Sequence, residues 1–349
     1  MSGLNNPRQL SLVHGDVLLV AEAGKGGTVG TITGPDGGKQ GLGYTGSISA
    51  VLAPASASGQ HPHRIVTGLL SAAVAAGGPG GPKGSQAIGP DGVSARSLNK
   101  IGIIETFFGP AAPAPAQSRN GHLLTATPYG PVRPVGNISG FEAKHDPDRK
   151  GFDSDPYAVL AYHDGWLVAD AAGNDVLFVK HGHVSVFHVF PNVKSGPCAS
   201  QFDPAPPFAG CNFVPTSLAT DRRGNVYVGG LSSLTPGQAR VVKLDREGDD
   251  VLRTWGGFSA VTGIAVGDDG SLYVSQLFAP QAHPIAPIVT GVLTRIRGGH
   301  RTNVDVPFPA GIAVDQHDNV FVSAFSILPD TGAGIPGVDT SGQLWRLRF

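Results

Sequence analysis

The chain repeats one pattern of apolar and polar positions. Residues 261–276, VTGIAVGDDGSLYVSQ, contain a short apolar run, a tight turn of Asp and Gly, and a second, alternating apolar run. Alternation with a period of two residues places apolar side chains on one face of a strand, so the pattern predicts a β-hairpin. Similar stretches begin at Pro215 and Pro309, which gives a spacing of roughly 47 residues, typical of solenoids and propellers.

Extended over the whole chain, the pattern predicts six units of short strands. We expect them over residues 4–69, 70–141, 153–192, 213–258, 259–306 and 307–349. Within the first unit, residues 25–43 are expected to form a Gly-rich loop. Four-stranded units that pack radially form a β-propeller, which leaves only short protected edges, whereas an open sandwich or a solenoid is the alternative. The predicted fold class is therefore all-β: one domain, 1–349, a six-bladed β-propeller of four-stranded antiparallel blades. Its last blade is expected to have three strands, or to be completed by very little of the N-terminus.

Composition supports this fold and excludes two classes of partner. Gly (51) and Pro (29) are abundant and charged residues make up only 15%, which favours turns and short strands over helices. The net charge is −1 without a basic cluster, so the footprint of a nucleic-acid or anionic-membrane binder is missing. No apolar run approaches the roughly 18–20 residues of a membrane helix, and we expect no membrane insertion.

Two cysteines, Cys198 and Cys211, stand at the ends of a Pro-rich segment. Neither lies in a CxxC motif or beside a His, so a disulfide between them is favoured over a metal site. A disulfide implies an oxidising compartment, extracellular or periplasmic. The start of the chain, MSGLNNPRQL, shows no signal peptide. Either the leader is absent from a mature sequence, or the cysteines stay reduced in a cytosol.

The lengths of the connections differ between the two ends of the strands. Turns between first and second strands are tight, whereas the connections after second strands are long: 25–43, 107–120, 231–238, 277–289 and 325–339. Antiparallel strands place these two sets on opposite faces, which we call the short-turn face and the long-loop face. Binding residues concentrate on loops that a rigid scaffold holds, so we expect a small molecule or a protein to bind on the long-loop face. We also expect the protein to be a monomer.

One position at the end of each second strand is predicted to point toward the central channel. In blade order these slot residues are Glu22, Glu105, Asp170, Gly230, Gln276 and Ala324. Three carboxylates, together with entry-loop oxygens, would suit Ca²⁺ or Mg²⁺, with Glu22, Glu105 and Asp170 as the metal ligands. The alternative is that carboxylates at a wet channel mouth are simply solvated.

The full set expected to bind a ligand at the channel mouth is Asn5, Asn6, Arg8, Glu22, Glu105, Asp153, Asp155, Tyr157, Asp170, Asn174, Asp175, Thr216, Gln276 and His283. Asn174 and Asp175 also fit ordinary turn chemistry. The pairs His61/His63 and His181/His183 have a metal-compatible spacing, but their loop and turn positions favour surface residues. The chain contains no G-x-S-x-G, H-E-x-x-H or phosphate-binding Gly-rich motif.

Several segments together resemble a known family. They are GLNNPRQLSL, LLVAEAG, GYTGSISAV, ISGFEAKHDPD, DSDPYAVLAYHDGWLVADAAGNDVL and VPTSLATDRRGNVYVGGL. These are similar to the ScyD/ScyE family of bacterial propellers, which is related to the NHL-type and SMP-30-like six-bladed propellers. The resemblance implies a six-bladed, usually exported protein of mostly undefined activity. Gly230, Gln276 and Ala324 depart from the family, in which acids or Asn are usual at these slots.

Two hypotheses about function follow. The first is a ligand- or partner-binding propeller with its site on the long-loop face at the central channel. The alternative is a metal-assisted hydrolase, lyase or cyclase acting on a small molecule of secondary metabolism. In that enzyme Glu22, Glu105 and Asp170 would hold the ion, and a carboxylate or His283 would transfer protons.

Overall fold

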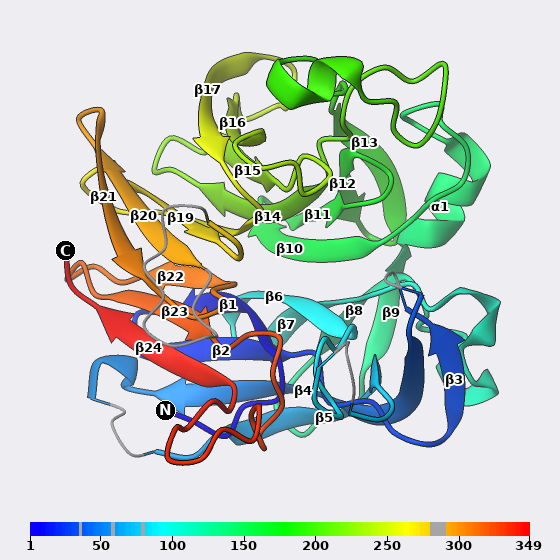
Figure 1. The fold of residues 1–349 in the computed structure, drawn as a ribbon, viewed down its shortest axis with the longest axis vertical. Coiled ribbons are helices and arrows are strands. Elements are labelled where there is room, and N and C mark those ends of the chain that lie inside the picture. The colour runs from blue at the N-terminus through cyan, green and yellow to red at the C-terminus, as the bar shows by residue number, and fades with distance from the viewer. Residues whose placement is uncertain (35–36, 57–59, 78–80, 280–290) are drawn as a thin grey trace.

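Six antiparallel sheets are arranged in a ring in the computed structural model, which describes residues 1–34, 37–56, 60–77, 81–279 and 291–349 (Figure 1). The predicted six-bladed β-propeller is confirmed. None of the helices in these ranges is long and apolar enough to cross a membrane.

The strands follow one another around the ring in chain order. Blade 1 contains β1 (Pro7–Val13), β2 (Val17–Glu22), β3 (Gly30–Thr33), β4 (Lys39–Leu52) and β5 (His63–Val74). Blade 2 contains β6 (Pro90–Ser97), β7 (Lys100–Glu105), β8 (His122–Ala126) and β9 (Arg133–Asn137), and helix α1 (Ile138–His145) follows it. Blade 3 contains β10 (Pro156–Tyr162), β11 (Gly165–Asp170), β12 (Asp175–Lys180) and β13 (His183–Val189). Blade 4 contains β14 (Pro215–Thr220), β15 (Val226–Gly230), β16 (Ala239–Leu244) and β17 (Val251–Phe258). Blade 5 contains β18 (Val261–Val266), β19 (Leu272–Gln276), β20 (Val292–Arg297) and β21 (His300–Asp305). Blade 6 contains β22 (Ile312–Val314), β23 (Val320–Ala324) and β24 (Gln343–Leu347).

The first strand of each blade lies at the centre of the ring. β1 contacts β6, and the contacts continue through β10, β14 and β18 to β22, which contacts β1 again. The second strands are the most buried, because they are covered on both faces by the neighbouring blades: every residue of β11 is buried, whereas β13 at the rim has a single buried residue. The core therefore lies between blades, for example where Ile104 of blade 2 packs with Trp166 and Val168 of blade 3.

The ring is closed by a few N-terminal residues beside the last blade. Blade 6 has three strands, and Leu4 forms an isolated bridge with Gly342. The N–H of Leu4 donates to the carbonyl of Gly342 at 3.0 Å, and the N–H of Leu344 donates to the carbonyl of Met1 at 3.0 Å. The fully buried Leu4 side chain packs with Leu344. The predicted three-stranded last blade, completed by very little of the N-terminus, is confirmed.

Blade 1 departs from the expected pattern. The segment predicted as a Gly-rich loop, 25–43, contains β3 and the beginning of β4, which pair with each other and make this sheet five-stranded. Its glycines allow close backbone approach: a Cβ on Gly43 would lie 2.4 Å from the carbonyl oxygen of Gly26. The expectation of a structureless loop is therefore wrong, because the glycines permit a second, tightly packed hairpin.

The predicted disulfide between Cys198 and Cys211 is present. Both residues are fully buried, and Val193 forms a backbone bridge with Cys211. The disulfide therefore fixes the base of the Pro-rich loop that follows blade 3.

Candidate functional site

The slot side chains hold the backbone on the long-loop face. In four blades the slot side chain accepts a backbone N–H: Glu22 from Asn5 (2.7 Å), Glu105 from Leu70 (2.8 Å), Asp170 from Asp155 (2.7 Å) and Gln276 from Ser259 (2.9 Å). All four are at most 1% exposed. An N–H that does not join a ladder needs an acceptor when it is buried, and the slot residue supplies it. These four side chains are therefore buried and bonded to the backbone of the long-loop face.

Glu22, Glu105 and Asp170 also do not form the predicted metal trio. Glu22 forms a salt bridge with Arg64 at 2.8 Å. Asp170 accepts the hydroxyl of Ser154 at 2.6 Å. The three carboxylates are absent from the groups of described residues whose potential ligand atoms lie within 4.8 Å of one another.

The other predicted residues divide into structural ones and members of a polar network. Asn6 donates to the carbonyls of Gly24 and Gly84, and the carbonyl oxygen of the Asn5 side chain accepts the N–H of Asp330. These bonds anchor the entry of the chain into blade 1. His283 lies outside the described residues.

Arg8, Asp91, Thr106 and Asp155 form a hydrogen-bonded chain across blades 1, 2 and 3. Arg8 Nε donates to Asp91 Oδ1 at 3.0 Å. The Thr106 hydroxyl lies 3.0 Å from Asp91 Oδ2 and 2.8 Å from Asp155 Oδ1. One hydroxyl hydrogen cannot serve both acceptors, so one carboxyl must carry a proton. Burial, reinforced by the charge of Asp91, raises the pKa of Asp155 to about 7. Burial raises the pKa of Asp91 as well, but its ion pair with Arg8 opposes that shift, so the proton is favoured on Asp155.

Tyr157 connects this network to the central channel. It lines a cavity of about 30 Å³ together with Gln9, Thr216 and Thr262 of the neighbouring inner strands. Burial raises the pKa of Tyr157 to about 12 despite the nearby Arg8. The Thr216 hydroxyl donates to the carbonyl of Val261 at 2.6 Å, which links blade 4 to blade 5. The channel is thus closed by interblade hydrogen bonds and has room for about one water molecule.

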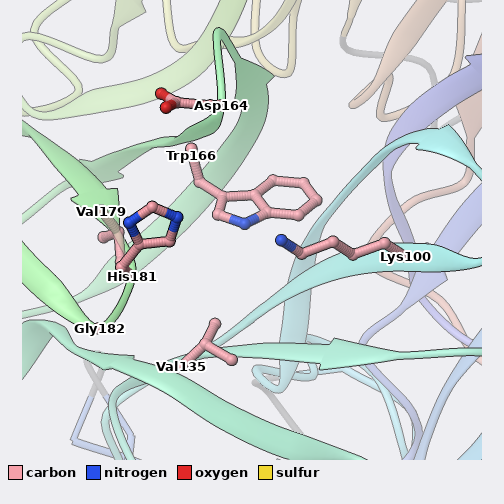
Figure 2. Close-up of a pocket in the computed structure, with 8 residues that line it drawn as sticks. Lys100, Val135, Asp164, Trp166, Val179, His181 and Gly182 are labelled. Atoms are coloured by element: carbon pink, nitrogen blue, oxygen red, sulfur yellow. The ribbon is translucent and has the colours of Figure 1, made fainter.

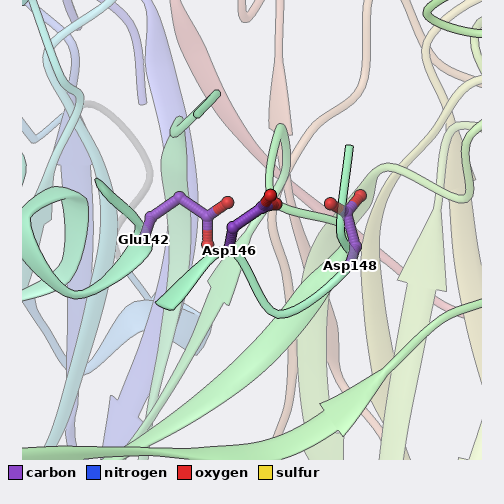
Figure 3. A group of neighbouring side chains, drawn as sticks. All are labelled: Glu142, Asp146 and Asp148. Carbon is purple, nitrogen blue, oxygen red and sulfur yellow. The ribbon is translucent and has the colours of Figure 1, made fainter. Parts of the chain in front are cut away.

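A second group of acids lies off the channel, beside helix α1. Glu142 on the helix and Asp146 and Asp148 in the following loop offer carboxylate oxygens that all lie within 4.8 Å of one another (Figure 3). Asp146 ends the helix in a left-handed conformation, with φ of 43°, and its N–H donates to the carbonyl of Glu142 at 2.9 Å. This hydrogen bond folds the chain back at the end of the helix and keeps Asp146 close to Glu142.

The surroundings of Glu142 add further negative charge. Within the described part of the chain, neither carboxylate oxygen of Glu142 or of Asp175 has a hydrogen-bond partner, although both side chains are fully buried. Burial, together with the charges of Asp170 and Asp148, raises the pKa of Glu142 to about 8. The pKa of Asp175 is also raised well above its ordinary value, first by burial and then by Asp170 and Glu142.

Other residues near this cluster have assigned partners. Asn174 donates to Asp148 Oδ2 at 2.9 Å and accepts the N–H of Val214 at 3.1 Å. Burial raises the pKa of Asp170 to about 6, and burial followed by Asp148 raises that of the exposed Asp153. The predicted residues Asp170, Asn174 and Asp175 therefore lie around an acidic site whose centre was not predicted.

A groove opens on the long-loop face next to these acids. It has a volume of about 420 Å³, and we call it the blade-3 groove; its walls include Asp148, Lys150, Phe190, Asn192, Lys194 and Phe208. The Lys150 ammonium donates to Asn192 Oδ1 at 2.7 Å and lies 3.2 Å from Asp148 Oδ2. One wall is the Pro-rich loop that the disulfide anchors.

The short-turn face carries a smaller hollow of about 260 Å³ between blades 2 and 3 (Figure 2). Figure 2 shows the Lys100 side chain approaching the indole of Trp166, with His181 beside it, and the Lys100 ammonium lies 5.8 Å from the ring centre. The nearby Asp164 is paired with Lys180 at 2.6 Å. These contacts are ordinary surface pairs of an interblade seam.

The residues missed by sequence reasoning lie mainly in the connection between blades 2 and 3. Asp91 and Thr106 are single polar residues at strand ends and carry no visible motif. The segment DPDRKG, residues 146–151, does carry a signal, because two acids two residues apart, followed by Gly, resemble the first half of a calcium-binding loop.

Comparisons with known proteins support the fold. No protein-family model and no curated protein sequence matches the chain. A solved structure from Thermus thermophilus, described as an oxidoreductase (glucose dehydrogenase), is similar with a TM-score of 0.52 at 14% identity, covering 99% of this chain and 97% of that one. A chain of a nidogen/laminin complex gives a TM-score of 0.50 at 11% identity, covering 81% of this chain and 84% of that one. A streptogramin B lyase gives 0.48 at 9% identity, covering 94% and 92%. At these identities the likeness shows the propeller fold alone.

Proposed function

We propose that this protein binds a small molecule on its long-loop face, in the blade-3 groove. The observation that carries the proposal is the difference in size between the channel cavity and the blade-3 groove. The channel cavity of about 30 Å³ has room for little more than water, whereas the groove of about 420 Å³ has the volume of an ordinary ligand pocket.

The groove walls suggest the class of ligand. Phe190 and Phe208 supply apolar surface, and the exposed Lys194 and the partly buried Lys150 supply positive charge. Phe190 stacks on Phe213 with ring centres 4.1 Å apart, which keeps its side chain rigid. A compact molecule with an aromatic or aliphatic body and an anionic group fits this combination.

An enzymatic role is the second candidate. It is favoured by Asp155, a half-buried carboxyl with a pKa of about 7 that shares Thr106 with Asp91 near the channel mouth. A carboxyl with that pKa can donate or accept a proton near neutral pH. The substrate of such a hydrolase, lyase or cyclase would bind above the channel.

Membership of the ScyD/ScyE family and an exported location belong to the same proposal. The resemblance of segments such as ADAAGND and VPTS supports the first. The disulfide between Cys198 and Cys211 supports an extracellular or periplasmic protein, since such bonds persist in oxidising compartments. We further propose that the chain acts as a monomeric single domain.

A thermal-shift screen of small organic acids, including aromatic, sugar and lactone-derived acids, tests the binding site. The screen is run on the wild type, Lys194→Ala, Phe208→Ala, Tyr157→Phe and the matched control Arg222→Ala. Arg222 is an exposed cation of the short-turn face that pairs with Asp268. We expect compounds that stabilise the wild type and the control but neither groove variant. A library without hits, or hits that both groove variants retain, would contradict the proposal. Hits lost only in Tyr157→Phe would favour the channel mouth.

A further inference from the structure

We propose that Glu142, Asp146 and Asp148 form a calcium site between helix α1 and the loop that follows it. This inference goes beyond the groove, and it stands whether or not an organic ligand binds there.

The first support is the arrangement of the three carboxylates. One oxygen from each lies within 4.8 Å of the other two, and Figure 3 shows the three side chains gathered at the end of the helix. Ca²⁺ binds oxygen ligands at about 2.3–2.6 Å, so ligands on opposite sides of one ion are separated by about 5 Å. The three acids thus fit around a single ion of this size.

The second support is independent of the spacing. Glu142 is 0% exposed, and no described residue offers a hydrogen-bond partner to either of its carboxylate oxygens. A buried carboxylate without partners is strongly unfavourable. A single proton would satisfy one oxygen at most, whereas Ca²⁺ commonly binds both oxygens of a Glu side chain.

The acids around Glu142 add to the negative charge of the site. Asp170 and Asp175 are buried next to the cluster, and neither oxygen of Asp175 has a hydrogen-bond partner among the described residues. Among the described residues, the salt bridge that these acids make is that of Asp148 Oδ2 with the Lys150 ammonium, at 3.2 Å. One lysine leaves most of this negative charge uncompensated, and a divalent ion would balance it.

The loop is built to present its acids. Asp146 accepts the N–H groups of Lys150 and Gly151, at 3.1 Å each, and Asp148 accepts the N–H of Lys150 at 3.1 Å. Gly151 has a φ of +93°, which allows the sharp turn that these bonds require. The loop therefore fixes both carboxylates before an ion arrives. In DPDRKG, Lys150 occupies the place of the third acid of a calcium-binding loop, and Glu142 from the preceding helix replaces that acid.

Calorimetric titration of chelator-treated protein with CaCl₂, and separately with MgCl₂, tests the site. We expect one Ca²⁺ per chain, with affinity at least about tenfold higher than for Mg²⁺, because Mg²⁺ demands a smaller octahedral site and retains its water. Glu142→Gln and Asp146→Asn should each weaken Ca²⁺ binding at least about tenfold, and Lys150→Met should strengthen it, since it removes a competing charge. Glu247→Gln, the same change at an exposed acid of a distant turn, should leave binding unchanged.

Folding of each variant is checked by circular dichroism and thermal melting. Loss of binding in Asp146→Asn supports the site even if Glu142→Gln misfolds. No heat of Ca²⁺ binding at millimolar concentration, Mg²⁺ bound as tightly as Ca²⁺, or undiminished binding in folded Glu142→Gln would each overturn the proposal. Failure of the organic-acid screen would leave this result unaffected, since the titration uses the metal ion alone.

Discussion

Replacing Glu105 with Gln should stabilise the protein at alkaline pH and leave it nearly unchanged in mild acid. Glu105 ends β7 with 0% exposure; Oε1 accepts the N–H of Leu70 at 2.8 Å, and Oε2 has no hydrogen-bond partner in the ranges that the structure describes. Burial raises its pKa from 4.5 to about 7, despite the charge of Arg119. Gln keeps the shape and the acceptor for Leu70, and it cannot ionise.

The sign follows from the raised pKa. The folded protein holds the proton more tightly than the unfolded chain, so the stabilising contribution is complete below the ordinary pKa of 4.5 and is lost as pH rises through about 7. One pKa unit corresponds to about 1.4 kcal/mol, so ionised Glu105 costs about 3 kcal/mol of unfolding free energy.

Urea unfolding of both proteins at pH 5 and pH 8.5 measures this difference. We expect Glu105→Gln to exceed the wild type by less than about 1 kcal/mol at pH 5 and by about 3 kcal/mol at pH 8.5. Other buried acids titrate in both proteins and cancel in the comparison. Glu247→Gln, whose side chain is 59% exposed, is the control and should show no such change. An advantage that is equal at the two pH values, or larger at pH 5, would refute the reasoning.

Three other substitutions test the framework by chemical unfolding at pH 7. Arg8→Met should cost about 3–5 kcal/mol, because it leaves the buried Asp91 without its cation, and adding Asp91→Asn should recover part of the loss; no recovery would contradict the pairing. Cys198→Ser should cost about 3 kcal/mol by opening the disulfide loop, and reducing agent should destabilise the wild type by a similar amount but not the variant. Gly102→Ala should cost about 1–3 kcal/mol, since the added methyl would lie 2.4 Å from the Trp166 ring; unchanged stability would show that this seam can move.

The fold was predictable because the hairpin repeat is a local pattern. Alternating apolar residues such as those of β19, together with turn residues such as Gly270, specify each hairpin without reference to the rest of the chain. The hairpin of β3 and β4 was missed because it lacks such a local pattern. Its glycines carry no alternation, and its strands form because backbones can approach closely, which depends on three-dimensional packing.

The candidate site was predicted only in part. Asp170 and Asp175 were identified because they flank a repeat strand, but the direction of Asp170 depends on the N–H of Asp155, a bond that the sequence does not show. Glu142 was missed because it lies on a helix inserted between repeats, so its position has no equivalent in another blade. Its burial follows from how α1 packs near blade 3, which is information carried by the tertiary structure alone.

A comparison of Glu22 with Glu142 indicates where a binding site can form in this fold. Glu22 is fully buried and accepts hydrogen bonds from Arg64, from the N–H of Asn5 and from Ser49, so its charge is used to hold blade 1 together. Glu142 is equally buried, yet neither of its oxygens has a hydrogen-bond partner among the residues described. A buried carboxylate that already accepts hydrogen bonds from the protein cannot bind a ligand without losing them, which would destabilise the fold. A buried carboxylate without such partners is instead stabilised when it binds a cation.

Long connections between blades destabilise a closed ring only slightly, since the entropy of closing a loop grows only slowly with its length. Binding groups are therefore expected in the segments between blades 2, 3 and 4, where α1 and the disulfide-anchored loop lie side by side with the groove, and not in the repeated slots.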